Sequence, residues 1–217
     1  MARPYTGNSD APAKGKRAGL EKFVELCAKQ FGMKNLGTYN VRLMRSAPAG
    51  TKPDDKNWLS VHATGRAADL GWDKRVKAID LIEFLEHYAD ALEIEEIHDY
   101  FYTGPKGQWG RGWRCNRKGK PGWKIYDSAD NAGTPGGKWV HFELSPKMAD
   151  NAALVEKTFK DIIKKADEDA KKDKAVAEYL KAVAAARAKA IADEEASKTP
   201  AQKAAEEAAA KAAAAKL

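Results

Sequence analysis

The sequence predicts an α+β domain, in which a small, mostly antiparallel sheet is backed by helices and followed by a long C-terminal helix. Two observations carry this prediction. Short strand-like segments alternate with helical ones up to residue 144, and from residue 149 onward the pattern is helical. With 217 residues, the chain is also long enough for one domain with a sizeable core and an additional segment.

The N-terminal part is expected to be a flexible basic arm that leads into the domain. Residues 1–18 mix Pro, Gly, Ser, Asn and Lys, a composition typical of mobile termini. From Gly19 onward, apolar residues recur at helical spacing up to Phe31, and Gly32 provides a stop. We therefore expect the domain to begin at residue 19.

Two strands and a helix are predicted next. Residues 37–45 are rich in β formers and predict a strand, which a turn-rich loop separates from a second short strand at 67–72. A helix is predicted over 74–90, because its apolar residues share one face and Asp73 can serve as its N-cap. The next strand is expected at 92–102, near the centre of the sheet.

The last part of the domain combines an irregular segment with one clear strand. Residues 103–137 are rich in Gly, Lys and Trp and predict a long loop, with one short strand at 122–126. Residues 138–144 alternate cleanly, so that two sets of side chains point to opposite faces. The apolar set is Val140, Phe142 and Leu144, and the other set is Trp139, His141 and Glu143. The domain is expected to end near residue 148.

The C-terminal part predicts a long helix over 149–198 and an Ala/Lys/Glu-rich tail over 199–217. The tail has high helix propensity but few apolar residues to bury. Three interpretations remain open: a helical stalk, a segment that binds a partner or self-associates as a coiled coil, and a solvated helix with frayed ends.

The stretch from Ser60 to Asp69, SVHATGRAAD, contains the first candidate ligands for a metal ion. His62 and Asp69 are seven residues apart, and a turn at Gly65 would allow both side chains to meet. Imidazole and carboxylate groups are common zinc ligands, and a catalytic zinc uses three protein ligands and one open position. His141, on the polar face of its predicted strand, supplies the third.

At these residues the chain resembles a known family. SVHATGRAAD matches the SxHxxGxAxD signature of the zinc D-Ala-D-Ala carboxypeptidase and L-alanyl-D-glutamate peptidase superfamily, whose fold is shared with the Hedgehog signalling domain. WVHFEL, at residues 139–144, is similar to the second signature, which supplies the last zinc histidine. The resemblance covers residues 19–146 and implies zinc bound by His62, Asp69 and His141. Many members are phage endolysins, so it also implies hydrolysis of peptidoglycan peptides.

The resemblance also suggests residues that contact the substrate. Ser60 falls at the opening serine of the signature. Arg45 is similar in place to the arginine that holds a substrate carboxylate in such enzymes, although an ordinary surface arginine is an equal alternative. Trp139 and the tryptophans of the long loop would line the groove.

The chain departs from the family at the position of the general base. Lys138 stands where family carboxypeptidases have the glutamate of ExxH, and Trp139 stands where other members have the histidine of HxH. Glu143 is the first replacement candidate, with orientation of His141 as its alternative role. The weaker candidates are His98, Asp127 and Asp130. A peptidase-like domain that has lost activity and has a structural or wall-binding role in a phage particle is therefore the second hypothesis.

Composition narrows the partners. The formal net charge of +7 favours an anionic partner such as a bacterial cell wall, whereas the scattered basic residues argue against nucleic acid. Cys27 and Cys115 fit no metal-binding spacing and are read as ordinary thiols. We expect no membrane span. The polar N-terminus lacks the apolar stretch of a signal peptide, so delivery through a phage holin or within a virion is the expectation.

Overall fold

The computed structural model describes residues 2–44, 46–127 and 135–197, with side chains described as far as residue 185. The chain divides into two units, Met1–Ile163 and Lys164–Leu217. The first unit contains the whole sheet and the candidate site, and the second consists, in its described part, of the continuation of one helix.

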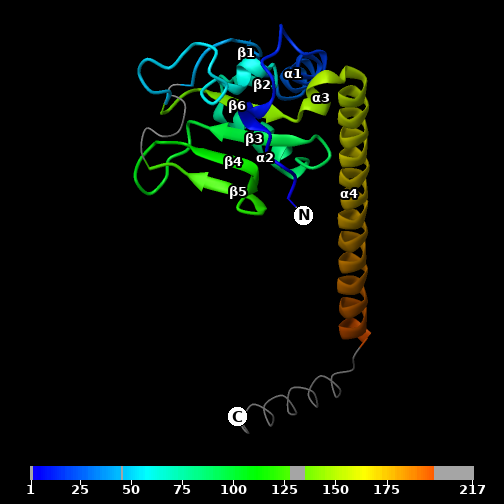
Figure 1. Ribbon diagram of the computed structural model, residues 1–217. Helices are drawn as coiled ribbons and strands as arrows, with labels where there is room; N and C mark the ends of the chain where they lie inside the picture. Colours follow the sequence, from blue (N-terminus) through cyan, green and yellow to red (C-terminus); the bar gives the residue numbers. More distant parts are fainter. Residues whose placement is uncertain (1, 45, 128–134, 198–217) are drawn as a thin grey trace. The chain divides into compact units, whose positions relative to one another are not determined.

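The first unit is built on a six-stranded sheet (Figure 1). Its strands are β1 (Lys34–Gly37), β2 (Ala67–Gly71), β3 (Ile94–Asp99), β4 (Arg111–Arg117), β5 (Lys120–Ile125) and β6 (Trp139–Leu144). They lie in the order β1-β2-β6-β3-β4-β5, and every neighbouring pair is antiparallel. The last strand of the chain therefore lies between β2 and β3, which places three distant sequence segments side by side.

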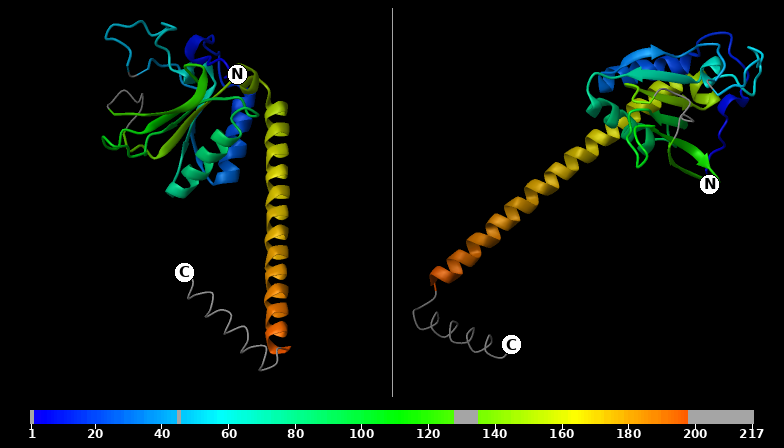
Figure 2. Two further views of the ribbon diagram at one scale, coloured as in Figure 1. Left: turned by 90° about the horizontal axis from the view of Figure 1, so that it is seen from below. Right: turned by 90° about the vertical axis from the view of Figure 1, so that its left-hand side faces the viewer.

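Helices cover one face of this sheet. The α-helices are α1 (Ala18–Phe31), α2 (Arg75–His87), α3 (Pro146–Asp150) and α4 (Ala152–Ser197), and two short 3-10 helices are η1 (Gly7–Ser9) and η2 (Val61–Thr64). Figure 2 shows α1 and α2 on the same side of the sheet. Gly19 permits close packing of α1 on α3, because a Cβ atom at this position would overlap the Met148 carbonyl oxygen. Gly32 ends α1 in the left-handed conformation, as the sequence predicts.

The hydrophobic core fills the space between these helices and the sheet. Phe142 of β6 is fully buried and contacts Phe23 of α1 edge to face, with ring centroids 5.3 Å apart. The first turns of α4 also belong to this core, through Val155, Phe159 and Ile162. The first unit therefore continues to Ile163, beyond the boundary at residue 148 that the sequence suggests.

The α+β class is confirmed, and one strand is displaced from its predicted position. Instead of a strand over 37–45, the chain forms β1 at Lys34–Gly37 and later a single bridge between Leu43 and Leu59. Gly37 pairs with Asp69, only two residues from the start of β2, so the sheet offers the following residues no partner. Antiparallel pairing with the short β2 therefore sets the length of β1.

The predicted irregular segment contains a hairpin, of which the sequence predicts one strand: the short strand expected at 122–126 corresponds to β5, whereas β4 was missed. Strands β4 and β5 pair across a two-residue turn, Lys118–Gly119, in which both residues have positive φ (54° and 90°). Turns of this kind match the twist of a hairpin. Arginines interrupt the alternation of β4, and Arg111 stacks over Trp123 at 4.2 Å from the ring centroid instead of pointing into water.

The predicted helix over 74–90 is shorter than expected and is capped differently. Helix α2 begins at Arg75, and Lys74 occupies the N-cap position without a side-chain hydrogen bond. Asp73 accepts a hydrogen bond from the Lys74 amide and pairs with Lys77 at 2.8 Å, so it is not the N-cap. The prediction of Asp73 as the cap is wrong because its carboxylate lies one residue before that position.

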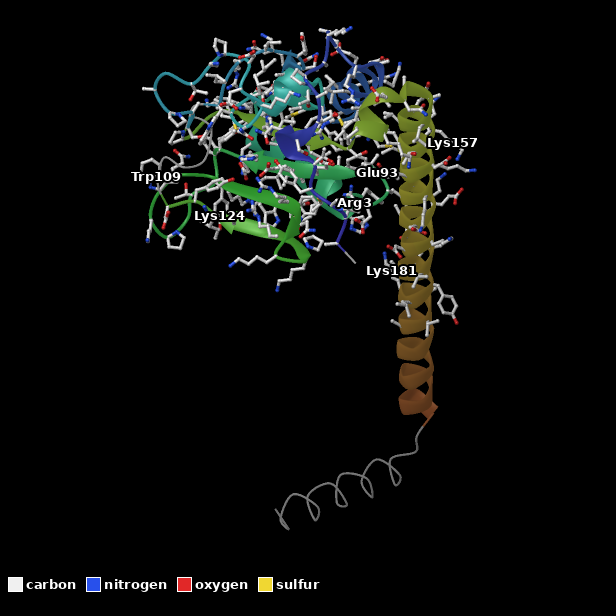
Figure 3. All side chains as sticks on the ribbon, in the orientation of Figure 1. Arg3, Glu93, Trp109, Lys124, Lys157 and Lys181 are labelled. Atoms are coloured by element: carbon white, nitrogen blue, oxygen red, sulfur yellow. The ribbon has the colours of Figure 1, made fainter. Side chains whose placement is uncertain are left out.

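The N-terminal segment, expected as a flexible arm, is fastened to the first unit. Arg3, labelled in Figure 3, donates hydrogen bonds to the carbonyl oxygens of Ala89 and Ile94 at 2.9 and 2.5 Å. Arg17 binds Asp150 through two hydrogen bonds of 2.7 and 2.6 Å. The basic residues that suggested a solvated arm thus have partners more than eighty residues away in sequence.

The second unit is helical over its described residues. A short break at Asn151, whose side chain accepts from the Leu154 amide, separates α3 from α4 within the predicted 149–198 helix. Among the side chains described between residues 164 and 185, the exposed large apolar ones are Val176, Tyr179, Leu180 and Val183. The predicted tail at 199–217 lies outside the described residues. Of the helices in the described part of the chain, none has the length and apolar character needed to cross a membrane.

Candidate metal centre

The pairing of strands brings the candidate ligands into one row on the face opposite the core. Asp69 of β2 pairs with His141 of β6, and His141 pairs in turn with His98 of β3. Directly opposite residues in an antiparallel sheet point to the same side. The three side chains therefore stand next to one another across three strands, although their positions in the sequence span 72 residues.

His62 reaches this row from the 3-10 helix η2 that precedes β2. The hydroxyl of Ser60 accepts a hydrogen bond from the His62 amide at 3.4 Å and caps the turn. Gly65 ends it with a φ of 67°, a left-handed conformation that favours glycine. The turn at Gly65 is the feature that the sequence predicts, and it directs the chain into β2 so that His62 faces Asp69.

The three predicted ligands converge closely enough to hold one ion. His62 Nε2 lies 3.3 Å from Asp69 Oδ2, and His141 Nδ1 lies 3.0 Å from Asp69 Oδ1. One ligand atom from each residue lies within 4.8 Å of the other two. Zinc–ligand bonds of about 2.0–2.1 Å in a tetrahedron place ligand atoms roughly 3.4 Å apart. Both the chemistry and the spacing of these residues fit a zinc ion.

Glu143 determines which nitrogen of His141 faces the other ligands. Its Oε1 lies 3.3 Å from His141 Nε2, on the opposite side of the ring from Asp69. Metal-binding histidines commonly donate their second ring N–H to a carboxylate in this way. This contact is the one expected if Glu143 orients His141, the second of the two roles that the sequence left open.

Hydrogen bonds between the candidate ligands shift the pKa values of His141 and Asp69 in opposite directions. Burial opposes a charge on His141, but hydrogen bonds with Asp69 and Glu143 outweigh it and raise the pKa of His141 to about 10. Burial also opposes the charge of Asp69, whose pKa is nevertheless held well below its usual range by hydrogen bonds from His141 and His62. A metal ion bound here would therefore have to displace a proton from His141.

A second polar row lies beside the ligand row. Glu143 pairs with Glu96 of β3, which pairs with Arg114 of β4. Glu96 is 3% exposed and receives two hydrogen bonds from Arg114, at 3.1 and 2.7 Å, and its Oε1 lies 3.2 Å from His98 Nε2. Burial opposes its charge, but His98 and Arg114 hold the pKa of Glu96 well below its usual range.

A pocket of about 290 Å³ opens over both rows. Ser60 and Trp139, predicted to contact substrate, line it, and Trp139 packs against Tyr100 with ring centroids 5.3 Å apart. Arg42 contributes an exposed guanidinium to the same pocket. Sequence reasoning singled out Arg45 instead, which lies outside the described residues, and Arg42 carries the same chemistry three positions earlier.

Two of the weaker base candidates lie elsewhere. Asp127 is exposed and pairs with Lys106 at 3.0 Å, away from the residues that line the pocket, and Asp130 lies outside the described residues. Lys138 lines a separate hollow beside Trp72. His98 is the candidate that the structure brings to the centre, with its ring 5.3 Å from that of His141.

Glu96, Arg114 and Tyr5 are pocket residues that sequence reasoning missed. The alternation of EEIHDY in β3 places Glu96 and His98 on one face, which was the available signal for Glu96. Arg114 and Tyr5 had none, because one lies in the unrecognised hairpin and the other in the supposed arm.

Comparison of the chain with models of protein families, with curated proteins and with solved structures finds no match. Within the described residues, His62, Asp69 and His141 form the one group of three or more His, Cys, Asp or Glu residues arranged to hold a metal ion. The proposal for the function of the chain therefore depends on this group of residues and on the pocket that they line.

Proposed function

We propose that the chain is a zinc-dependent peptidase that hydrolyses stem-peptide or cross-link bonds of peptidoglycan. The observation that carries the proposal is the convergence of His62, Asp69 and His141 at the floor of a pocket, with Glu143 on the outer nitrogen of His141. When bound, zinc supplies Lewis acidity that polarises a carbonyl and acidifies water. Two imidazoles and one carboxylate are a ligand set used by zinc hydrolases.

The pocket residues suit a peptide that carries a carboxylate. Arg42 is exposed at the pocket and offers a planar set of donors that matches a carboxylate. Trp139 supplies an apolar wall on the same face as His141. The net charge of +7 favours accumulation on an anionic cell wall. Together with the family resemblance, these features favour a phage lysin or a virion-associated wall hydrolase.

Proton transfer is assigned to His98 rather than to Glu143. Glu143 lies 3.3 Å from the outer nitrogen of the proposed ligand His141, a contact that supports an orienting role for this carboxylate. His98 lines the pocket beside His141, with Glu96 Oε1 3.2 Å from its Nε2 and the Tyr126 hydroxyl 3.3 Å from its Nδ1. A base supported by a carboxylate is a recurring catalytic arrangement.

Zinc content and wall hydrolysis test this function together. The full chain is purified with zinc, its metal content is measured, and release of peptides from purified peptidoglycan is followed by mass spectrometry. We expect about one zinc per chain and hydrolysis that His62→Ala abolishes. The matched control is His87→Ala, an exposed histidine on α2 whose loss leaves both properties unchanged. A metal-free wild type, or equal hydrolysis by His62→Ala, would contradict the proposal.

The second candidate function is a catalytically inactive peptidase-like protein with a structural or wall-binding role in a phage particle. The observation in its favour is that Lys138 and Trp139 occupy the positions of the two general bases used in the family. Stoichiometric zinc and binding to peptidoglycan without release of any peptide would establish this alternative. If His98→Gln retains zinc but loses hydrolysis, the alternative is excluded, because a loss can be observed only when the wild type is active.

A further inference from the structure

The N-terminal residues 3–10, here called the N-terminal strap, cross one end of the pocket. Tyr5 and Asn8 line the pocket directly. The strap is held to the sheet through contacts with β3, β4 and β6 and with Arg66 in the loop before β2. It is therefore a wall of the candidate metal centre and not a separate arm.

Two anchors fix the strap on either side of Tyr5. On one side, Arg3 donates to the backbone at the start of β3, including the Ile94 carbonyl. On the other, the Thr6 hydroxyl and amide donate to Glu95 at 2.7 and 3.1 Å. Glu95 also pairs with Arg66, which is fully buried and donates to the Gly7 carbonyl. These contacts hold the strap without any contribution from the Tyr5 hydroxyl.

The Tyr5 side chain instead points at the second polar row. Its hydroxyl lies 2.7 Å from Glu96 Oε2 and 3.2 Å from Glu143 Oε2, between two buried carboxylates, and it can donate its single proton to one of them at a time. The guanidinium of Arg114 lies 4.0 Å from the centroid of the Tyr5 ring and fixes its plane.

Glu143 depends on this hydroxyl. It is 3% exposed, and its two oxygens contact His141 Nε2 and the Tyr5 hydroxyl, so loss of the hydroxyl removes one of its two protein partners. We propose that Tyr5 is a positioning residue of the metal centre: it holds Glu143, which holds His141 with Nδ1 turned toward Asp69 and His62. This inference rests on the proposed zinc site and adds the N-terminal strap to it.

Zinc affinity measured by competition with a chromophoric chelator tests the inference on the full chain. Tyr5→Phe removes only the hydroxyl and is expected to weaken zinc binding about tenfold, the lower end for changes to groups that orient a ligand. Thr6→Val is the matched control, because it removes a neighbouring strap hydrogen bond of 2.7 Å that leads to Glu95 and not to Glu143. It is expected to leave zinc affinity within about twofold of the wild type. Circular dichroism verifies that each variant folds.

The Glu143→Gln background separates positioning from general stabilisation. If Tyr5 acts through the Glu143 carboxylate, Tyr5→Phe will weaken zinc binding in the wild type but add less than about twofold in Glu143→Gln. An unchanged affinity in Tyr5→Phe, an equal loss in Thr6→Val, or the same tenfold loss in both backgrounds would overturn the role of Tyr5 while leaving the zinc site intact. A wild type that binds no zinc would overturn the site itself and the inference with it.

Discussion

The two faces of the same sheet both bury side chains, but different forces hold them together. On the core face, Phe142 is 0% exposed and contacts only apolar neighbours from the helices and the sheet. On the pocket face, the adjacent residue Glu143 is 3% exposed and contacts an imidazole and a phenol. The first face is stabilised by removing apolar surface from water, and the second by pairing charges that would otherwise be costly to bury.

The buried fraction of the side chains therefore does not by itself identify the functional face of this sheet. Polar side chains buried in rows across several strands require partners from other rows, and these partners fix their geometry. The core face tolerates changes that conserve volume, whereas the pocket face tolerates changes that conserve charge pairing. Four substitutions test whether the two faces are stabilised in these different ways, and they are described in decreasing order of expected effect.

The largest effect is expected from Phe142→Ala. The substitution leaves a cavity beside Phe23, and large-to-small changes of a buried phenylalanine lower the free energy of unfolding by about 3–5 kcal/mol. Chemical denaturation followed by circular dichroism measures this loss. The folded fraction should bind zinc with wild-type affinity, because no ligand contacts Phe142 across the sheet. Reduced zinc affinity in the folded protein would show that the two faces are not independent.

Arg66→Met should approach the same cost by a different cause. It leaves Glu95, which is 2% exposed, without its cation, and breaking a buried ion pair costs about 3–5 kcal/mol. Adding Glu95→Gln removes the unpaired charge and should restore part of the lost unfolding free energy. No restoration in the double variant would mean that Arg66 stabilises the protein by packing, as Phe142 does.

Asp69→Asn should separate function from folding. The side chain keeps its shape but loses the charge that contacts both histidines, so zinc affinity should fall by more than about 100-fold, beyond the range for changes to surrounding groups. The unfolding free energy of the metal-free protein should change by less than that of Phe142→Ala, since Asp69 is partly exposed. Chelator competition and denaturant titration measure the two quantities. Retained zinc affinity would exclude Asp69 as a ligand.

The smallest effect is expected at Glu93, which directly precedes β3 and contacts Ser145 and the exposed Lys147. Burial opposes its charge, but Lys147, Ser145 and Arg3 lower the pKa of Glu93. The folded pKa lies below the unfolded one, so the stabilisation is present above about pH 4.3 and is lost as the pH falls through the folded pKa.

Glu93→Gln should therefore lower the melting temperature slightly at pH 7 and not at all in strong acid. Water screens the pair, which limits the effect to less than about 1 kcal/mol. Thermal melts of both proteins from pH 7 to pH 2.5 measure the difference. A gap that widens in acid would contradict the lowered pKa of Glu93.

Much of this architecture could be predicted where a local pattern reports the environment. Strand β6 and its two faces follow from strict alternation, and α1 follows from the spacing of its apolar residues. The candidate ligands His62, Asp69 and His141 could be proposed because resemblance to a family signature suggests two of them and strand alternation suggests the third. Each of these signals lies within a dozen consecutive residues.

The rest depends on contacts that no local pattern reports. Strand β4 was not predicted because its arginines interrupt the alternation of polar and apolar residues. In the structure, stacking and ion pairs hold these arginines against the sheet. The strap escaped because a composition typical of mobile termini says nothing about single side chains with distant partners. Tyr5 contacts residues 91 and 138 positions later in the chain.

These large sequence separations mean that the candidate centre forms late in folding. Before β6 emerges, Tyr5 has no Glu143 to hold, and His62 and Asp69 lack their third ligand. Long-range closures of this kind require prior assembly of the elements between them, which slows the final step of folding. Tyr5 can therefore reach its position only after β6 has paired, and the candidate centre is complete only when residues from both ends of the domain have met.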